Sequence, residues 1–246
     1  MERTWMSTIS VDCVIFGFDQ NQLKVLLAER WIKDQEGNLL DKDYTLTGYH
    51  IYQDEDLDSA AHRIVEDITG LEGLHFEQFY SFGDLNRLQK EKDQRWLKQF
   101  GDVFSERVIS VAYYSLLPST KIQILDKDRN IEWFPVYEIE NLAYDHHKIL
   151  DKAIKHLRYR LSHEPIAFDL LPKKFTISQM YKLYESIYNT KYDKRNFRRK
   201  VSQMKFVVPL DEYQSAVANK PAQLYMFSRD VYEATKKDHH GFFFNY

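Results

Sequence analysis

Positive charge is concentrated in one short segment of this chain. Of its 246 residues, those from 173 to 205 include ten Lys and Arg and two acidic residues, Glu185 and Asp193, which gives the segment +8. The whole chain has a formal charge of −3, so the remainder carries −11. A compact basic segment attached to an acidic body is typical of a nucleic-acid-binding domain joined to a separate functional domain. A chain of this length can form two modest cores, and we therefore expect two domains.

The composition also narrows the class of protein. A hydrophobic content of 43% is enough to form a core, and the single cysteine, Cys13, excludes an intrachain disulfide framework. No apolar run approaches the roughly 18 residues that a membrane span needs. The first ten residues lack the basic-then-apolar layout of a signal peptide. We therefore predict a cytoplasmic protein without a membrane partner.

Apolar patterning predicts a strand-rich first domain with one prominent helix. The helix is expected over residues 57–69, where apolar side chains recur at three- and four-residue spacing, and Gly70 ends it. A strand over 7–18 and its hairpin neighbour over 23–30 are predicted from alternating and then continuous apolar residues. A polar loop is expected over 34–43, and further strands over 44–48, 76–82, 108–116 and 132–135. This pattern is that of an α+β sandwich.

The basic segment shows the pattern of a winged helix. Ser178 and Asp193 are good N-caps for two short helices, and the apolar stretches FVVPL and QLYMF that follow predict a two-stranded wing. Before these helices, residues 145–162 predict another helix, which ends in a Pro-marked loop over 164–172. We therefore divide the chain into a first domain over 1–150, a connecting helix and linker over 151–172, and a winged helix over 173–246.

The loop and helix around residues 48–71 resemble the Nudix box of diphosphate hydrolases. In that family a Gly and a Glu precede a helix with the pattern Arg-Glu-apolar-x-Glu-Glu-x-Gly-apolar. Ile64 and Ile68 stand where two of its glutamates belong. The remaining positions are Glu55, Arg63, Val65, Gly70 and Leu71, which match, Asp67, which is a shorter acid, and Tyr49, which replaces the first Gly although Gly48 precedes it.

The two isoleucines remove the chemistry of the box. The family's helix points several carboxylates from one face at Mg²⁺ that bridges a diphosphate. At about 100° per residue, positions 64, 67 and 68 share this face. Asp67 is therefore the only carboxylate left on it, and the two isoleucines make it an apolar surface that is unfavourable for a cation. The resemblance therefore implies a Nudix-like α/β/α sandwich that is not an enzyme and holds no metal or cofactor. Two alternatives stay open: a hydrolase of ADP-ribose or nucleoside diphosphate compounds, and a helix that is simply part of the core.

A Nudix-like domain without hydrolysis can still bind a small molecule, and polar residues near the box are candidate ligands. A concave site lined by aromatic and a few polar groups suits a small polyol or sugar. Loss of the Mg²⁺-loaded phosphate site favours a neutral, hydroxyl-rich effector. The predicted effector-binding residues are Glu29, Arg30, Tyr44, Thr45, Thr47, Tyr49, His50 and Asp67. Each also has a structural interpretation, as a surface ion pair, a loop residue or a packing residue.

The second helix of the basic segment is predicted to bind DNA. Phe197 and Val201 lie four residues apart and can anchor its inner face, which leaves the basic residues outside. Arg and Asn suit bidentate contacts with guanine and adenine edges, whereas Lys suits phosphates. The predicted DNA-binding residues are Lys191, Lys194, Arg195, Asn196, Arg198, Arg199, Lys200 and, in the wing loop, Lys220. RNA or an acidic protein partner is the alternative, because charge alone does not separate these ligands.

Both halves of the chain together resemble one family. The segment LLPKKFTISQMYKLYESIYNTKYDKRNFRRKVSQM, with KPAQLYMF, is similar to the winged helix of the Nudix-related transcriptional regulators. Within that family the resemblance is strongest to the arabinose-responsive AraR branch. It implies a homodimeric repressor of sugar utilisation genes that leaves a palindromic double-stranded DNA operator when L-arabinose binds. The alternative within the family is a regulator of NAD metabolism that senses ADP-ribose.

Overall fold

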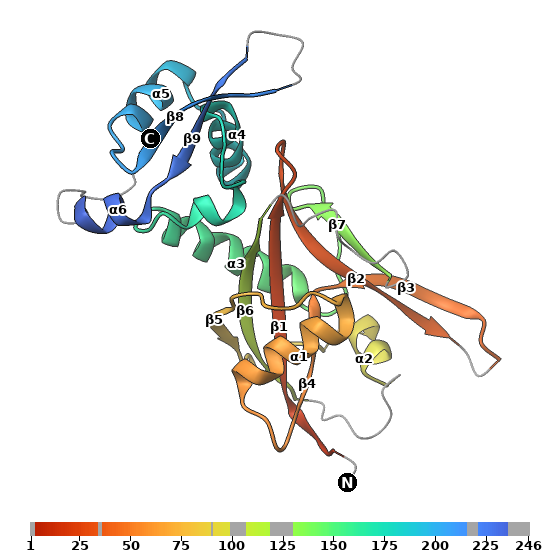
Figure 1. Ribbon diagram of the computed structural model, residues 1–246. Helices are drawn as coiled ribbons and strands as arrows, with labels where there is room; N and C mark the ends of the chain where they lie inside the picture. Colours follow the sequence, from red (N-terminus) through yellow and green to blue (C-terminus); the bar gives the residue numbers. More distant parts are fainter. Residues whose placement is uncertain are drawn as a thin grey trace. The chain divides into compact units, whose positions relative to one another are not determined.

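The structure, a computed structural model, describes residues 3–33, 36–89, 91–98, 107–118, 130–215 and 221–235 (Figure 1). These residues form two compact units. The first contains the described residues up to 155 except 17–23 and 117–118, and the second contains those two pieces and the residues from 156 onward. Helix α3 (His146–Leu161) contributes residues to both units. The limits of 150 and 173 drawn from the sequence stay a prediction.

The first unit is built around strand β1 (Trp5–Phe18), in which every residue from Ser10 to Phe18 is buried. A continuous buried run of this kind is typical of a central strand, and the strand predicted over 7–18 is confirmed. The sheet order is β3-β2-β1-β6-β5, with β4 paired to β1 and β7 paired to β2. The other strands are β2 (Leu23–Lys33), β3 (Leu39–Thr45), β4 (Thr47–Tyr52), β5 (Glu77–Phe82), β6 (Ile109–Leu117) and β7 (Ile131–Pro135).

Helix α1 (Leu57–Thr69) has the limits that the sequence predicts. The Asp56 side chain caps it by accepting a hydrogen bond from the Ser59 N–H at 2.7 Å. Gly70 ends it in the left-handed region, at φ 71°, and donates its N–H to the Glu66 carbonyl. The apolar stripe packs against β4, which brings the Nudix-like helix next to the strand that carries Tyr49 and His50.

The polar loop predicted over 34–43 is wrong for its second half, because β3 begins at Leu39. Antiparallel pairing with β2 sets Arg30 opposite Asp43, Trp31 opposite Lys42 and Ile32 opposite Asp41. β3 is an edge strand whose side chains are mostly polar, so the sequence shows no apolar alternation there. Helix α2 (Glu91–Lys98), which follows β5 along the chain, was also not predicted.

The second unit has the helix-turn-helix and two-stranded wing that the sequence predicts. Helix α4 (Ile177–Tyr188) leads to α5 (Lys194–Ser202), and β8 (Val207–Tyr213) pairs antiparallel with β9 (Gln223–Phe227). A short 3₁₀ helix (Ile166–Leu170) precedes them and α6 (Arg229–Thr235) follows. None of the helices that the structure describes combines the length and the apolar character of a membrane span.

One helix cap in the second unit differs from the prediction. Thr176, not Ser178, caps α4, because its hydroxyl accepts from the Gln179 N–H while the Gln179 side chain accepts from the Thr176 N–H. This is the reciprocal capping box of a Thr-x-x-Gln sequence, which satisfies two backbone donors at once. Asp193 caps α5 as predicted, with the Asn196 N–H at 2.7 Å from its carboxylate.

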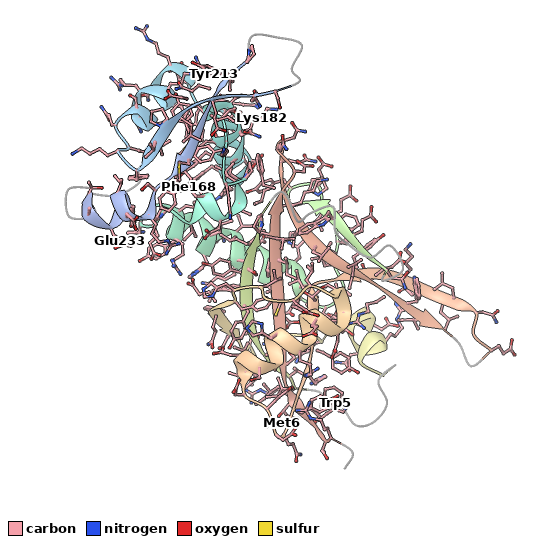
Figure 2. All side chains as sticks on the ribbon, in the orientation of Figure 1. Trp5, Met6, Phe168, Lys182, Tyr213 and Glu233 are labelled. Carbon is pink, nitrogen blue, oxygen red and sulfur yellow. The ribbon has the colours of Figure 1, made fainter. Side chains whose placement is uncertain are left out.

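Aromatic side chains form the core of the second unit. Phe168 of the 3₁₀ helix stacks on Phe227 of β9, with ring centroids 4.5 Å apart, and also packs against Phe175 and Phe206 (Figure 2). Large rings dominate the burial of a small core, and this cluster fixes the wing strands to the segment that precedes α4.

Candidate effector pocket and nucleic-acid interface

The first unit contains a cavity of about 70 Å³. Strands β1, β2, β3, β4 and β6 supply its walls, and the start of α3 supplies its floor. A hydrogen bond of 2.6 Å between the Ser10 and Ser110 hydroxyls joins two of these strands. The lining residues are Ser10, Asp12, Arg30, Thr45, Gly48, Tyr49, His50, Arg87, Leu88, Val108, Ser110, Tyr144 and His146.

A buried carboxylate, that of Asp12, lies in the wall of this pocket. Asp12 is 4% exposed, and a side chain at the facing Gly48 would collide with its carboxylate, so glycine is required there. The Nε2 atom of His146 is 3.4 Å from its Oδ1. Burying a carboxylate is costly unless it accepts hydrogen bonds, and Asp12 therefore remains an acceptor for the hydroxyl groups of a ligand.

The tautomer of His146 follows from its second contact. Its Nδ1 accepts the Leu46 N–H at 3.0 Å, which places the ring proton on Nε2, the atom that faces Asp12. Burial lowers the pKa of His146, and this outweighs the opposite effect of the Asp12 charge. The ring is therefore neutral at neutral pH and holds the first turn of α3 against the pocket.

The two arginines of the pocket differ in their hydrogen-bond partners. Arg87 is buried and donates two hydrogen bonds to Asp145, at 2.7 and 3.0 Å, and another to the Phe82 carbonyl. Arg30 makes one hydrogen bond among the described residues, to the Gly48 carbonyl at 3.5 Å. A guanidinium has five donors, so Arg30 keeps its charge and most of its donors for an anionic ligand.

Tyr144 adds a strained backbone position to the pocket. Its φ is 59°, in the left-handed region that side chains other than glycine seldom adopt. Burial raises the pKa of its phenol, which therefore stays protonated and is a hydrogen-bond donor at physiological pH. Backbone strain of this kind is found at ligand-binding sites more often than elsewhere, and here it lies two residues before the imidazole of His146.

Helix α5 presents its basic side chains to solvent. Phe197 and Val201 are buried and hold the helix to the second unit, as the four-residue spacing predicts. The Asn196 side chain accepts a hydrogen bond of 2.9 Å from Arg199, which aligns two of the side chains on the outer face. Lys191, just before the helix, is 91% exposed. Lys194, Arg195, Asn196, Arg198 and Arg199 are exposed, Lys200 is half-buried, and Lys220 lies outside the described residues.

One carboxylate holds the turn between α4 and α5. Glu185 accepts the Tyr192 N–H at 3.2 Å and is 3.4 Å from the Lys191 ammonium. The Tyr181 hydroxyl lies within hydrogen-bond distance of both the Glu185 carboxylate and the Tyr192 carbonyl. The turn is therefore fixed by side chains, which sets the start of α5 relative to α4.

Each half of the chain matches a known domain family. The family model of the NUDIX domain matches residues 6–157, and that of the NrtR DNA-binding winged helix domain matches residues 167–227. The chain is 30% identical over 232 residues to the ADPR responsive transcriptional repressor NtrR of Acinetobacter baylyi, covering 92% of this chain and 84% of that protein. The chain belongs to the family of Nudix-related transcriptional repressors.

Solved structures share the whole architecture of this repressor family member. Shewanella oneidensis NrtR complexed with a 27mer DNA aligns with a TM-score of 0.67 at 23% identity, over 92% of this chain and 95% of that one. A MutT/nudix family protein from Enterococcus faecalis aligns with a TM-score of 0.62 at 20% identity, over 93% and 89%. At these identities the likeness concerns the fold, which is a Nudix domain followed by a winged helix.

The Nudix box of this family member contains an ion pair between Glu55 and Arg63. Glu55 accepts a hydrogen bond from Arg63 at 2.9 Å and another from the Tyr52 N–H at 2.8 Å. Burial acts to raise the pKa of Glu55, but these hydrogen bonds prevail and lower it. Ile64 is 1% exposed, so a carboxylate-bearing position of the family is part of the core. Across the described ranges no group of three or more His, Cys, Asp or Glu could hold a metal ion.

Four of the eight predicted effector residues line the pocket: Arg30, Thr45, Tyr49 and His50. The other four lie elsewhere. Glu29 pairs with Lys42, Thr47 donates to the Cys13 carbonyl at 2.9 Å, Tyr44 packs on Phe134 with its hydroxyl 3.5 Å from Glu132, and Asp67 is 66% exposed beside Arg63.

The sequence interpretation also missed six polar residues of the pocket, which are Ser10, Asp12, Arg87, Ser110, Tyr144 and His146. Asp12 could have been identified from the sequence, since a charged residue inside a buried apolar strand is rare without a partner. Tyr144 and His146 could not, because only the folded chain brings them next to the other pocket residues.

Proposed function

We propose that this protein is a repressor that binds an operator in double-stranded DNA through α5 and releases it when a nucleotide of the ADP-ribose type occupies the pocket of its Nudix domain. The observation that carries this proposal is the pairing, in one small pocket, of the available guanidinium of Arg30 with the buried carboxylate of Asp12. The first suits a phosphate and the second suits the hydroxyls of a ribose.

The same observation separates ADP-ribose from L-arabinose, the effector that the sequence resemblance implies. A pentose has hydroxyls for Asp12 but no negative charge for the half-buried guanidinium of Arg30, whereas a phosphate supplies one. The A. baylyi relative, named as ADPR responsive, supports the nucleotide. None of the relatives described above supports arabinose or sugar utilisation genes, and ADP-ribose is therefore the better assignment.

On DNA, we assign Arg195, Asn196 and Arg199 to base edges in the major groove and the flanking lysines to phosphates. The Asn196–Arg199 hydrogen bond supports this division, because it holds two bidentate side chains in one orientation. Arg198, Lys200 and Lys220 complete the proposed phosphate contacts. A homodimer would place two such helices on two half-sites of a palindrome, about one helical turn apart.

The effector assignment is tested by operator titration with ADP-ribose, L-arabinose and no ligand. We expect ADP-ribose alone to weaken operator binding, and Arg30→Ala to raise the ADP-ribose concentration required by roughly tenfold or more. Lys42→Ala is the matched control, because its ammonium pairs with Glu29 outside the pocket. Release by L-arabinose but not by ADP-ribose would overturn the assignment, and hydrolysis of ADP-ribose with Mg²⁺ would restore the enzyme alternative.

The DNA assignment is tested by combining Arg195→Ala with Arg199→Ala. We expect the double variant to lose roughly 100-fold in operator affinity while its affinity for ADP-ribose is unchanged. Lys152→Ala, which removes a cation of the first unit, serves as the control for net charge. Unchanged operator affinity in the double variant, or binding that is insensitive to salt, would favour an acidic protein partner instead.

A further inference from the structure

Three aromatic side chains form a continuous stack beside the effector pocket. Trp5 of β1, which is labelled in Figure 2, stacks on Tyr52 of β4. Their ring centroids are 3.7 Å apart and their planes differ by 19°. Tyr49, which lines the pocket, meets Trp5 at a centroid distance of 5.0 Å. We call Trp5, Tyr49 and Tyr52 the aromatic shelf. All three rings are half-buried, so the shelf continues the pocket wall to the protein surface.

Two arginines pack against the shelf, and carboxylates of the protein pair with both of them. The Arg3 guanidinium lies 3.9 Å from the centre of the Tyr52 ring, and that of Arg63 lies 4.5 Å from it. Arg3 is paired with Asp54 at 2.9 Å, and both arginines contact Glu55. The shelf is therefore a rigid, nearly neutral surface, which suits a flat uncharged group better than a phosphate.

The indole of Trp5 is half-buried, so part of its surface is exposed. Among the described residues the indole of Trp5 has one stacked neighbour, Tyr52, while Tyr49 meets it at an interplanar angle of 62°. The Arg63 guanidinium lies over the same ring, 5.5 Å from its centre. The exposed part of the indole suits stacking by a purine ring, since every base offers a π-face.

We infer that the aromatic shelf binds the base of the effector, so that a purine stacks on Trp5 while the phosphates that follow it reach Arg30. This inference rests on the proposed function and adds to it a site for the base of the ligand. Tyr49 both lines the pocket and belongs to the shelf, so a ligand longer than a ribose phosphate meets a continuous surface from the pocket to Trp5. The remainder of such a ligand extends past Tyr49 onto the shelf.

The test compares ADP-ribose with ribose 5-phosphate, which has the sugar and phosphate but no base. In titrations of the full chain, Trp5→Ala is expected to weaken ADP-ribose binding by roughly tenfold or more and to leave ribose 5-phosphate binding unchanged. Trp5→Phe keeps a stacking ring and is expected to retain most of the affinity. Trp133→Ala is the matched control, because Trp133 lies on β7, which pairs with β2 and supplies no residue to the pocket.

Tryptophan fluorescence gives a second readout. The chain has four tryptophans, so ADP-ribose is expected to quench a fraction of the emission that Trp5→Phe removes and Trp133→Phe does not. Equal weakening of both ligands by Trp5→Ala, or a quench that survives Trp5→Phe, would overturn the shelf while leaving ADP-ribose as effector. If the wild-type protein binds neither ADP-ribose nor ribose 5-phosphate, the effector assignment fails and the shelf fails with it.

Discussion

At the scale of single residues, Gly48 is the position where the pocket leaves no room for a side chain. A Cβ there would fall on the buried Asp12 carboxylate, which would have to shift. We expect Gly48→Ala to destabilise the first unit by about 1–3 kcal/mol and to reduce effector binding, because Asp12 must turn away from the ligand. Denaturant unfolding and ligand titration measure the two effects.

Gly83→Ala is the control for this substitution. Its Cβ would meet only Ile109, at an ordinary contact distance of 3.9 Å. An alanine at 48 with full stability and full effector affinity would show that the Asp12 carboxylate is not held where the structure places it.

The buried histidines make stability depend on pH in one direction. Burial lowers the pKa of His146 and of His50 below the ordinary value of 6.5. The unfolded chain therefore takes up protons first as pH falls through about 6.5, so unfolding becomes easier toward acid and stability is fully present above that pH. Each histidine contributes at most about 1.4 kcal/mol per pH unit.

His146→Asn isolates one of these contributions. An amide oxygen can still accept the Leu46 N–H, but it does not titrate. We expect the loss of stability between pH 7.5 and 5.5 to be smaller in the variant than in the wild type. The carboxyls with lowered pKa, those of Asp54, Glu55 and Asp56, protonate only at more acidic pH and do not interfere. The same pH slope in both proteins would mean that His146 is not kept neutral by burial.

At the scale of secondary structure, Glu185 is the carboxylate that holds the α4–α5 turn. Glu185 is 11% exposed and accepts hydrogen bonds from both sides of the turn. We expect Glu185→Ala to destabilise this turn by about 2 kcal/mol, the order of magnitude for lost hydrogen bonds to a charged group. Faster hydrogen exchange of the Tyr192 amide and weaker operator binding are the observable results.

Glu212→Ala provides the comparison, since Glu212 forms an exposed ion pair with Lys174 and such pairs contribute little. Glu185→Gln, which keeps an acceptor, is expected to lie between wild type and Glu185→Ala. If all three variants exchange the Tyr192 amide at the wild-type rate, the turn is held by its backbone and not by Glu185.

The elements that could be predicted from the sequence are those whose limits are encoded locally. Helix α1 was predicted at both ends because its apolar stripe and its terminal glycine are adjacent in the chain. β3 was missed because an edge strand with polar side chains has no apolar period, and the α4 cap was misplaced because its Thr-x-x-Gln box was overlooked. Only some of the pocket residues could be predicted, because the pocket joins residues that are far apart in the sequence. His146 and the Leu46 N–H that orients it are 100 residues apart, and only the sheet brings them together.

At the scale of the whole molecule, helix α3 links the pocket to the winged helix along the chain. It begins at His146, whose ring lines the pocket, and it ends at Leu161 within the second unit. A ligand that gives Asp12 a new partner therefore acts on the first turn of a helix that also belongs to the DNA-binding half. Linkage requires that the effector and the operator weaken each other's binding by the same factor.

Lys155 is the place to test whether α3 carries this coupling. It is exposed and is the last residue of α3 that belongs to the first unit. Lys155→Pro removes one helix hydrogen bond and clashes with the preceding turn, at a local cost of about 3 kcal/mol, Lys155→Gly costs about 1 kcal/mol, and Lys155→Ala is the control. We expect the ratio of operator affinities without and with ADP-ribose to fall toward one in the order Ala, Gly, Pro. Each ligand alone should still bind, because the pocket and α5 are each formed within one unit. A ratio that stays at the wild-type value in the proline variant would show that the coupling does not depend on an intact α3, and would direct attention to contacts between two copies of the chain.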